Sequence, residues 1–158
     1  MPDLAEIKIK KLIDECYKHQ YRINSAYSKI EYKLPLTEQV YKNLTDEDIE
    51  HIDQFIFRFS KLQDAIGQRL FKAMLIFLEE DVETLPFIDV LNKLEKLRLL
   101  ESTEQWKQLR EIRNAIAHEY DDSPQLMAQV LNTVFDARIE LFAIYENFKK
   151  TYKARISN

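Results

Sequence analysis

The chain has 158 residues, of which 46% are hydrophobic and 32% are charged, and its formal net charge at pH 7 is -4. This length suits one domain with a sizeable apolar core. The acidic balance disfavours a protein that coats long nucleic acid through general basic charge. One glycine and four prolines are too few for a turn-rich β protein, so we expect long uninterrupted helices.

The cysteine count and the hydropathy pattern point to a compartment. A single cysteine, Cys16, can form neither an internal disulfide nor a cysteine zinc cluster, which favours a reducing environment. Charged residues soon after Met1 interrupt any secretory segment. The longest apolar run, residues 73–78, is far shorter than the roughly 20 residues of a membrane span. We therefore expect a cytoplasmic protein without a membrane-spanning helix.

Two long helices are expected in the first half of the chain. Residues 4–30 carry apolar residues near one face and predict the first helix, whereas residues 31–44 lose the helical period and form a connection. Thr45 and Asp48 have the spacing of a capping box and open the second helix. Its apolar positions recur in steps of three and four, the strongest helical signal in the sequence: Ile52, Phe55, Phe59, Leu62, Ile66, Leu70, Ala73 and Phe77.

This pattern predicts a helix over residues 46–79. It runs through Gly67, whose missing side chain would let a neighbouring helix approach closely. After an acidic break at residues 79–84, Pro86 is well placed in the first turn of a third, shorter helix. The expected buried side of that helix is Phe87, Leu91, Leu94 and Leu97.

The last third of the chain predicts two more helices. Ser102 or Thr103 caps a fourth helix, and its expected buried residues are Trp106, Leu109, Ile112 and Ile116. Ser123 as N-cap and Pro124 at the first helical position open the last helix. This helix ends in a basic tail that we expect to fray after about residue 150. Long amphipathic helices with short connections predict one domain over residues 1–158, an antiparallel bundle of four to five helices.

Polar residues on the fourth helix form the one concentrated chemical signal. At 3.6 residues per turn, Arg113 lies beside the apolar face, while Asn114 and His118 share a polar stripe with Lys107 and Glu111. An arginine beside a buried face needs a carboxylate, a phosphate or a second subunit opposite it. A lone arginine and histidine at this spacing is nevertheless structural in most helical proteins. The other two histidines, His19 and His51, have no clustered partner at the spacing of metal or catalytic ligands, so we assign them structural roles.

The complete string Arg113-Asn114-Ala115-Ile116-Ala117-His118-Glu119-Tyr120 closely resembles the signature of HEPN domains. That signature is an arginine, a polar residue, three further residues and then a histidine. The tyrosine two places after the histidine resembles the narrower pattern of HepT-type toxins, which are encoded beside minimal nucleotidyltransferase antitoxins. Residues 58–67 also look like the bacterial members of this group.

The resemblance implies a HEPN-like fold and a metal-independent endoribonuclease that works as a dimer, with both motifs facing one cleft. His118 would act as acid or base, Arg113 would bind the scissile phosphate, and Asn114 would orient the imidazole or bond the phosphate. No cofactor or metal site is expected, since the sequence has no zinc-protease motif and no Cys/His cluster. RNA cleavage needs one group that accepts a proton and another that donates one, and each chain supplies a single histidine, His118, at this site. This requirement independently favours a homodimer or a larger assembly of dimers.

Tyr120 has a separate role in this interpretation. The resemblance implies that a nucleotidyltransferase antitoxin AMPylates it, and the added bulk and charge beside Arg113 would exclude RNA. The plain alternative is a half-buried, hydrogen-bonded aromatic residue at a helix end. Two functions compete with the ribonuclease for this protein. The first is a non-catalytic HEPN-like binding subunit of a nucleotidyltransferase, and the second is an adaptor bundle that uses an exposed helix face for protein contacts.

Overall fold

The computed structural model describes residues 3–118 and 123–157, with the backbone alone for Ala117 and His118. Every regular element in these ranges is helical, which confirms the expected all-α class. The elements are α1 (Leu4–Ile30), the 3₁₀ turn η1 (Glu31–Lys33), α2 (Glu38–Lys42), α3 (Asp46–Asp64), the π-helix η2 (Ala65–Leu70), α4 (Phe71–Phe77), α5 (Phe87–Lys96), α6 (Thr103–His118) and α7 (Pro124–Ile156).

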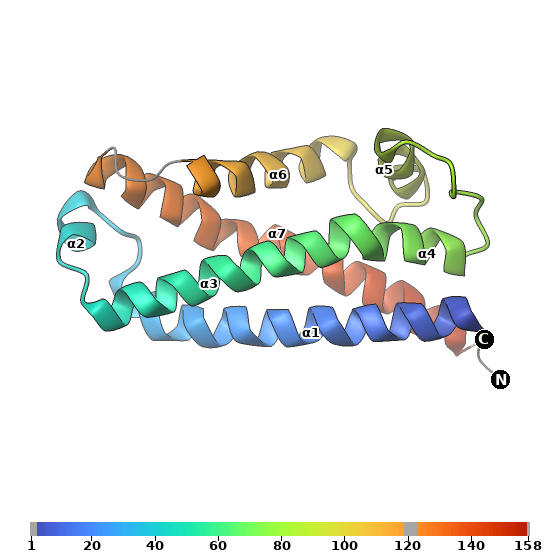
Figure 1. Cartoon of the computed structure of the whole chain (residues 1–158), viewed down its shortest axis with the longest axis horizontal. Helices are drawn as coiled ribbons and strands as arrows, with labels where there is room; N and C mark the ends of the chain where they lie inside the picture. The colour runs from blue at the N-terminus through green and yellow to red at the C-terminus, as the bar shows by residue number, and fades with distance from the viewer. Residues whose placement is uncertain (1–2, 119–122, 158) are drawn as a thin grey trace.

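The long helices form an antiparallel bundle (Figure 1). α1 runs along one edge, and α3, η2 and α4 return beside it as one continuous rod. α6 then runs in the direction of α1, and α7 returns diagonally behind the other helices, while the short α5 lies near the end of α4. No helix in the described part of the chain is both long enough and apolar enough to cross a membrane.

Short-range hydrogen bonds fix where the long helices begin. The Asp3 carboxylate accepts a hydrogen bond from the backbone nitrogen of Glu6 at 2.8 Å. Thr45 and Asp48 form the expected capping box, in which each side chain accepts from the other residue's backbone nitrogen at 3.1 Å. Ser123 caps α7, whose first turn holds Pro124 as expected. Each such cap satisfies backbone donors that have no partner inside the helix.

Aromatic side chains join the helices in the core. Phe55 of α3 meets Phe135 of α7 edge-on, with ring centroids 4.9 Å apart. Nearer the other end, Phe71 of α4 contacts both Trp106 of α6 at 4.6 Å and Phe148 of α7 at 5.4 Å. Such pairs contribute about 0.5–1.5 kcal/mol each beyond the burial of their area. Aromatic contacts between helices therefore add to the mainly aliphatic core of the bundle.

Four sequence expectations need correction or extension. The helix predicted for residues 46–79 is α-helical only in two parts, because η2 interrupts it, and α4 ends at Phe77. The buried side of α5 consists of Val90, Leu91 and Leu94, and the expected residues Phe87 and Leu97 are 39% and 42% exposed. Pro86 precedes the first turn of α5 as its N-cap. At the other end of the chain, α7 continues through the basic tail to Ile156.

Candidate functional site

The start and the buried face of α6 place the candidate residues. Ser102 caps the helix by accepting a hydrogen bond from the backbone nitrogen of Gln105 at 3.0 Å. Trp106, Leu109 and Ile116 then turn into the core, with 2%, 0% and 8% of their surface exposed. The stripe predicted to be polar lies on the exposed side, where Lys107, Glu111 and Asn114 are all accessible.

The structure describes only part of the predicted motif. Arg113 and Asn114 lie in the last two turns of α6, and His118 is the last residue of that helix. At 1.5 Å per residue, the backbone of His118 is about 6 Å along the helix axis from that of Asn114. The side chain of His118 and the whole of Tyr120 lie outside the described residues.

Arg113 has the kind of partner that the sequence demands, a carboxylate from another helix. Its Nη2 atom donates to Oδ2 of Asp64, the last residue of α3, at 2.8 Å. The pair is half-buried, with 38% of the Arg113 side chain and 30% of the Asp64 side chain exposed. The Nε atom of Arg113 is buried and has no hydrogen-bond partner among the described residues. One edge of the guanidinium is therefore fixed by Asp64, and the rest keeps unused donors.

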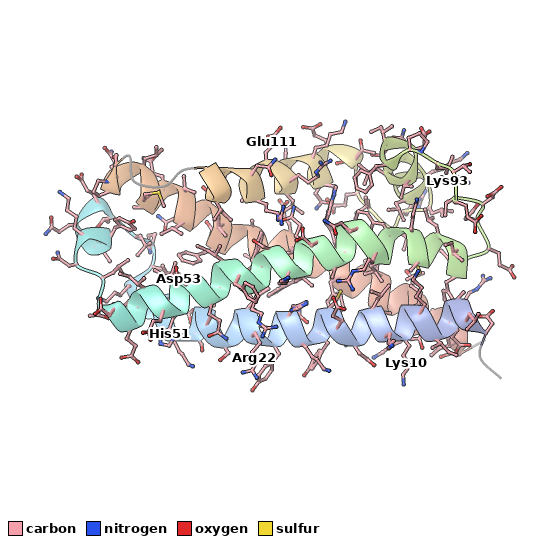
Figure 2. All side chains as sticks on the ribbon, in the orientation of Figure 1. Lys10, Arg22, His51, Asp53, Lys93 and Glu111 are labelled. Atoms are coloured by element: carbon pink, nitrogen blue, oxygen red, sulfur yellow. The ribbon has the colours of Figure 1, made fainter. Side chains whose placement is uncertain are left out.

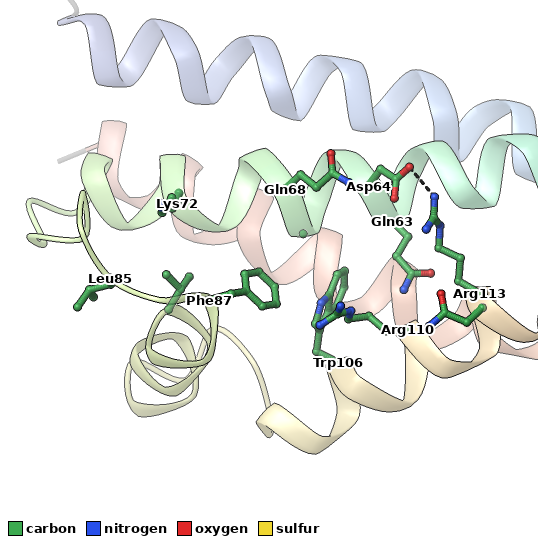
Figure 3. A pocket seen from close by; sticks show the side chains of 12 residues that line it. Gln63, Asp64, Gln68, Lys72, Leu85, Phe87, Trp106, Arg110 and Arg113 are labelled. Atoms are coloured by element: carbon green, nitrogen blue, oxygen red, sulfur yellow. Dashed lines mark hydrogen bonds and ion pairs between the residues drawn. The ribbon is translucent and has the colours of Figure 1, made fainter.

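A cavity of about 490 Å³ opens beside this ion pair, where α3, η2 and α4 face α5 and α6 (Figure 3). That volume lies within the range of about 300–1,000 Å³ typical of small-molecule sites. Both members of the ion pair, Asp64 and Arg113, line the cavity. The other lining residues are polar (Gln63, Gln68 and Asn114), cationic (Lys72 and Arg110), aromatic (Phe87 and Trp106) or small and aliphatic (Gly67, Leu85 and Val90).

Gln63 is the most unusual residue of this lining. Its side chain points from α3 toward α6 (Figure 3). Only 2% of its surface is exposed, and neither its amide nitrogen nor its amide oxygen has a hydrogen-bond partner among the described residues. Leaving a buried polar group unpaired costs about 1–3 kcal/mol. A protein that keeps such a residue gives reason to look for a ligand that would pair it.

The π-helix η2 explains how the cavity wall is shaped. Gly67 lies in η2 opposite the indole of Trp106, and a Cβ atom built on this glycine would lie 2.6 Å from Cζ2 of that ring. The close approach expected at Gly67 is thus present, between one helix backbone and the largest side chain of the next helix. Single π-turns inside α-helices are frequent at functional sites, and this one lies in the wall of the cavity.

The cavity is lined by more positive than negative charge. Asp64 is the one acidic side chain among its lining residues, against Lys72, Arg110 and Arg113. Lys72 and Arg110 are exposed, and neither has an ion-pair partner within 4 Å among the described residues. The Arg110 guanidinium lies over the ring of Phe87, 5.6 Å from its centroid. The site is therefore suited to an anion, although the whole chain is acidic.

A second polar cluster joins α1 to the α3–α4 rod and was not predicted from the sequence. Arg69 donates to the Glu15 carboxylate at 2.9 Å, and Glu15 also lies 3.6 Å from His19. The other ring nitrogen of His19, Nδ1, is 3.2 Å from Nη1 of Arg58. Burial lowers the pKa of His19 and Arg58 lowers it further, against the opposing effect of Glu15. These contacts tie α1 to the α3–α4 rod and agree with the structural role expected for His19.

The neighbouring cysteine, Cys16, is unreactive. Cys16 is fully buried, and burial, with the nearby Glu15 carboxylate, raises the pKa of its thiol to about 12. A thiol with so high a pKa is almost never ionised at neutral pH and is a poor nucleophile. The expected role of Cys16 as a small buried residue agrees with this environment.

Sequence reasoning missed Gln63, Lys72 and Arg110, although the sequence contained a signal for Gln63. Gln63 follows Phe59 by four residues and precedes Ile66 by three, so it is a polar residue on the apolar face of the strongest helical pattern in the chain. A polar residue at such a position is more informative than an exposed apolar one. Lys72 and Arg110 carry no such signal, because only the packing of α4 against α6 and α5 brings them together.

Two further findings bear on the site. Within residues 3–118 and 123–157, no three histidine, cysteine, aspartate or glutamate side chains gather closely enough to hold a metal ion. Comparison of the chain with protein-family models, with characterised proteins and with solved structures finds no match.

Proposed function

We propose that this protein is a metal-independent endoribonuclease of the HEPN type, acting as the toxin of a toxin–antitoxin pair. The observation that carries the proposal is the position of Arg113, five residues before His118 in the HEPN-like motif and at the edge of a cation-lined cavity. A guanidinium with free donors beside an open cavity is suited to a phosphodiester.

The chemistry follows from the residue types. A base removes the proton from the ribose 2′-hydroxyl, whose oxygen then bonds to phosphorus. The bond from phosphorus to the 5′-oxygen breaks, and an acid protonates that oxygen. Histidine suits both roles because its ordinary pKa is near neutrality. In a two-fold dimer, His118 of one protomer would act as base and His118 of its partner as acid. Arg113 would stabilise the charge that develops on the phosphate, and Asn114 would orient His118 or bond the phosphate.

RNA cleavage by the purified protein tests this proposal. We expect cleavage in EDTA, with 2′,3′-cyclic phosphate ends, and we expect His118→Ala and Arg113→Ala to reduce the rate by about 10²–10⁴-fold. His51→Ala and Arg22→Ala are matched controls, since both residues lie outside the candidate site. Cleavage that survives in both site variants, or that stops in EDTA, would contradict the proposal.

The ion pair between Arg113 and Asp64 requires a further control. If Arg113 acted only by tying α6 to α3, breaking the pair from the other side would have the same effect. Asp64→Asn removes the carboxylate charge and leaves the guanidinium in place. We therefore expect Asp64→Asn to keep cleavage within about tenfold of wild type, well above the loss in Arg113→Ala. Equal losses in the two variants, with helical circular dichroism unchanged, would assign Arg113 a structural role.

Control of the activity belongs to the same proposal. A nucleotidyltransferase antitoxin would join the α-phosphate of ATP to the phenol oxygen of Tyr120 and release pyrophosphate. The attached nucleotide would then exclude the RNA phosphate by bulk and by repulsion. Intact mass after incubation with the partner and ATP tests this step. A mass gain that persists in Tyr120→Phe would place the modification on another residue.

Two observations favour a second candidate function. The net charge of -4 and the engagement of Arg113 by Asp64 also fit a non-catalytic HEPN-like subunit that binds a nucleotidyltransferase. Such a subunit would form a stable complex with the enzyme and cleave none of a broad set of RNAs. The cleavage assay therefore separates the two functions.

A further inference from the structure

Four polar side chains connect α1 to the α3–α4 rod, and one of them, His19, has an ordinary pKa near neutrality. Arg58 of α3 approaches Nδ1 of the His19 ring at 3.2 Å, and Nε2 of the same ring lies 3.6 Å from the Glu15 carboxylate. Glu15 in turn accepts a hydrogen bond from Arg69 of η2 at 2.9 Å. None of the four residues lines the cavity beside Arg113, so this connection is separate from the candidate functional site.

The contact with Arg58 defines the protonation state of His19. An arginine side chain offers donors and no acceptor, so Nδ1 of His19 must be the acceptor. The ring is then neutral and carries its proton on Nε2, the atom that faces Glu15. A second proton would lie on Nδ1 and would face the Arg58 guanidinium. It would therefore remove the acceptor and bring two positive charges together.

The surroundings of His19 favour the neutral ring. Its side chain is 13% exposed, and the charged groups that face it are Glu15 on α1, Arg58 on α3 and Arg69 on η2. Burial lowers the pKa of the ring, the Glu15 carboxylate opposes this effect, and Arg58 lowers the pKa further. The contacts and the burial thus select the same form of the ring.

Arg58 depends on His19 for its link to α1. No carboxylate in the described part of the chain lies within 4 Å of Arg58. The Arg58 guanidinium also lies over the ring of Phe57, 5.7 Å from its centroid, but Phe57 belongs to the same helix. A proton on His19 would therefore break the hydrogen bond that joins Arg58 to α1.

We propose that His19 is a proton-operated latch between α1 and the α3–α4 rod. The neutral ring closes the latch, because it accepts from Arg58 and donates to Glu15. Proton uptake opens the latch, because the charged ring repels Arg58 and competes with Arg69 for the Glu15 carboxylate. Mild acid therefore loosens α1 from α3. The latch acts whether or not the protein is a ribonuclease.

Nuclear magnetic resonance of the ring nitrogens tests the first half of the proposal. The chain has three histidines, and the signals that disappear in His19→Gln identify the ring. We expect the Nε2–H tautomer at pH 7 and a titration midpoint below about 6.5, the ordinary value. In Arg58→Gln the facing cation is gone, so the midpoint should rise. A proton on Nδ1 at pH 7, or a midpoint that does not move in Arg58→Gln, would overturn the proposal.

Hydrogen exchange of the α1 amides tests the second half. His19→Gln keeps an acceptor and a donor in the side chain but does not titrate. We expect equal protection of α1 in wild type and His19→Gln at pH 7. At pH 5, α1 of wild type should exchange at least about threefold faster than α1 of His19→Gln. Equal protection in the two proteins at pH 5 would contradict the latch.

His51→Gln is the matched control for this experiment. His51 also follows a glutamate by four residues, and its Nε2 atom lies 3.6 Å from Glu47, but it lies near the start of α3 (Figure 2). His51→Gln should therefore show the same acid-dependent exchange of α1 as wild type. Loss of that dependence in His51→Gln, with the dependence kept in His19→Gln, would assign the latch to the wrong histidine.

The free energy of unfolding gives an independent measurement. The unfolded ring takes up a proton at higher pH than the folded ring, so the contribution of the latch is constant above about pH 6.5 and is lost as the pH falls further. Each unit by which the folded midpoint lies below the unfolded one raises the unfolding equilibrium constant about tenfold at acid pH. Urea unfolding should therefore show that wild type loses more stability than His19→Gln between pH 7 and pH 5. Equal losses in the two proteins would overturn the proposal.

Discussion

Asp48 is a buried carboxylate whose charge supports the start of α3. Only 3% of its surface is exposed. It accepts hydrogen bonds from the Thr45 backbone at 3.1 Å and from the Tyr32 hydroxyl at 2.9 Å, and Lys33 lies 3.1 Å away. Burial alone would raise the pKa of this carboxyl, but the hydrogen bonds together hold the pKa well below its usual range.

The lowered pKa predicts how stability depends on pH. A carboxyl with a depressed pKa stabilises the fold above its unfolded value, about 3.9, and this contribution is lost as the pH falls further. We expect Asp48→Asn to lower the free energy of unfolding by about 1–3 kcal/mol at pH 7. The difference from wild type should shrink below about pH 4, as measured by urea unfolding from pH 7 to pH 3.

Asp46→Asn serves as the control for that experiment. Asp46 is an exposed acid in the same first turn of α3, where its interaction with the helix dipole is worth only about 0.3–1 kcal/mol. A difference between wild type and Asp48→Asn that stays constant from pH 7 to pH 3 would show that the carboxylate charge does not stabilise the helix start.

At the residue scale, the sequence predicted that Arg113 needs a partner, but it did not predict which residue that partner is. Its place beside the apolar face required a carboxylate, a phosphate or a second subunit. The structure supplies Asp64, which is 49 residues away in the chain. Helical periodicity reports the face on which a residue lies, but not which face of another helix lies opposite. The same limit hid Lys72 and Arg110, which come together only through packing.

At the scale of elements, both ends of α1 and the starts of α3 and α7 were predicted correctly, whereas the ends of α4 and α7 were not. Short polar patterns such as Thr45 with Asp48 mark a helix start, because they satisfy the free backbone donors of the first turn locally. Ends usually show as a glycine in the left-handed region, but the one glycine here lies inside η2. Glu79 and Arg98 instead take φ values of 64° and 62° just beyond α4 and α5, and neither residue type signals a helix end.

Gly67 gives the element-scale prediction. Alanine is about 1 kcal/mol better than glycine inside a helix, so helix propensity alone favours Gly67→Ala. The added Cβ would lie 2.6 Å from a ring atom of Trp106, which is buried and packed edge-on against Phe71. Because this ring has little room to move, we expect Gly67→Ala to lower the free energy of unfolding by about 1–3 kcal/mol.

A double-mutant cycle checks the cause of that loss. Trp106→Leu removes the ring, so in this background Gly67→Ala should no longer destabilise the protein and should show the favourable helix propensity. Urea unfolding followed by circular dichroism measures all four proteins, since the second variant has lost its tryptophan. An equal loss in both backgrounds would assign the effect to the π-helix backbone and not to contact with Trp106.

The whole molecule has two contrasting long edges (Figure 2). Along α6 the exposed stripe contains Lys107, Glu111 and Asn114 and leads to the helix end at His118. Along the other edge, α1 exposes Tyr17 and Tyr21. The proposed ribonuclease mechanism requires the α6 edge to face a second copy, because each protomer contributes one His118 to the shared cleft.

Self-association through α6 is therefore the prediction for the whole molecule. Wild-type protein should sediment as a two-fold dimer, or as an assembly of such dimers, at micromolar concentration. Glu111→Trp places a bulky ring on the α6 stripe, two turns before His118 and outside the cavity lining, and should dissociate the dimer. Lys10→Trp introduces the same side chain on the outer side of α1 (Figure 2) and should not. RNA cleavage should fall with the dimer population, since a monomer would lack the second histidine. A dimer that persists in Glu111→Trp and dissociates in Lys10→Trp would place the interface on α1, and a cleaving monomer would contradict the shared cleft.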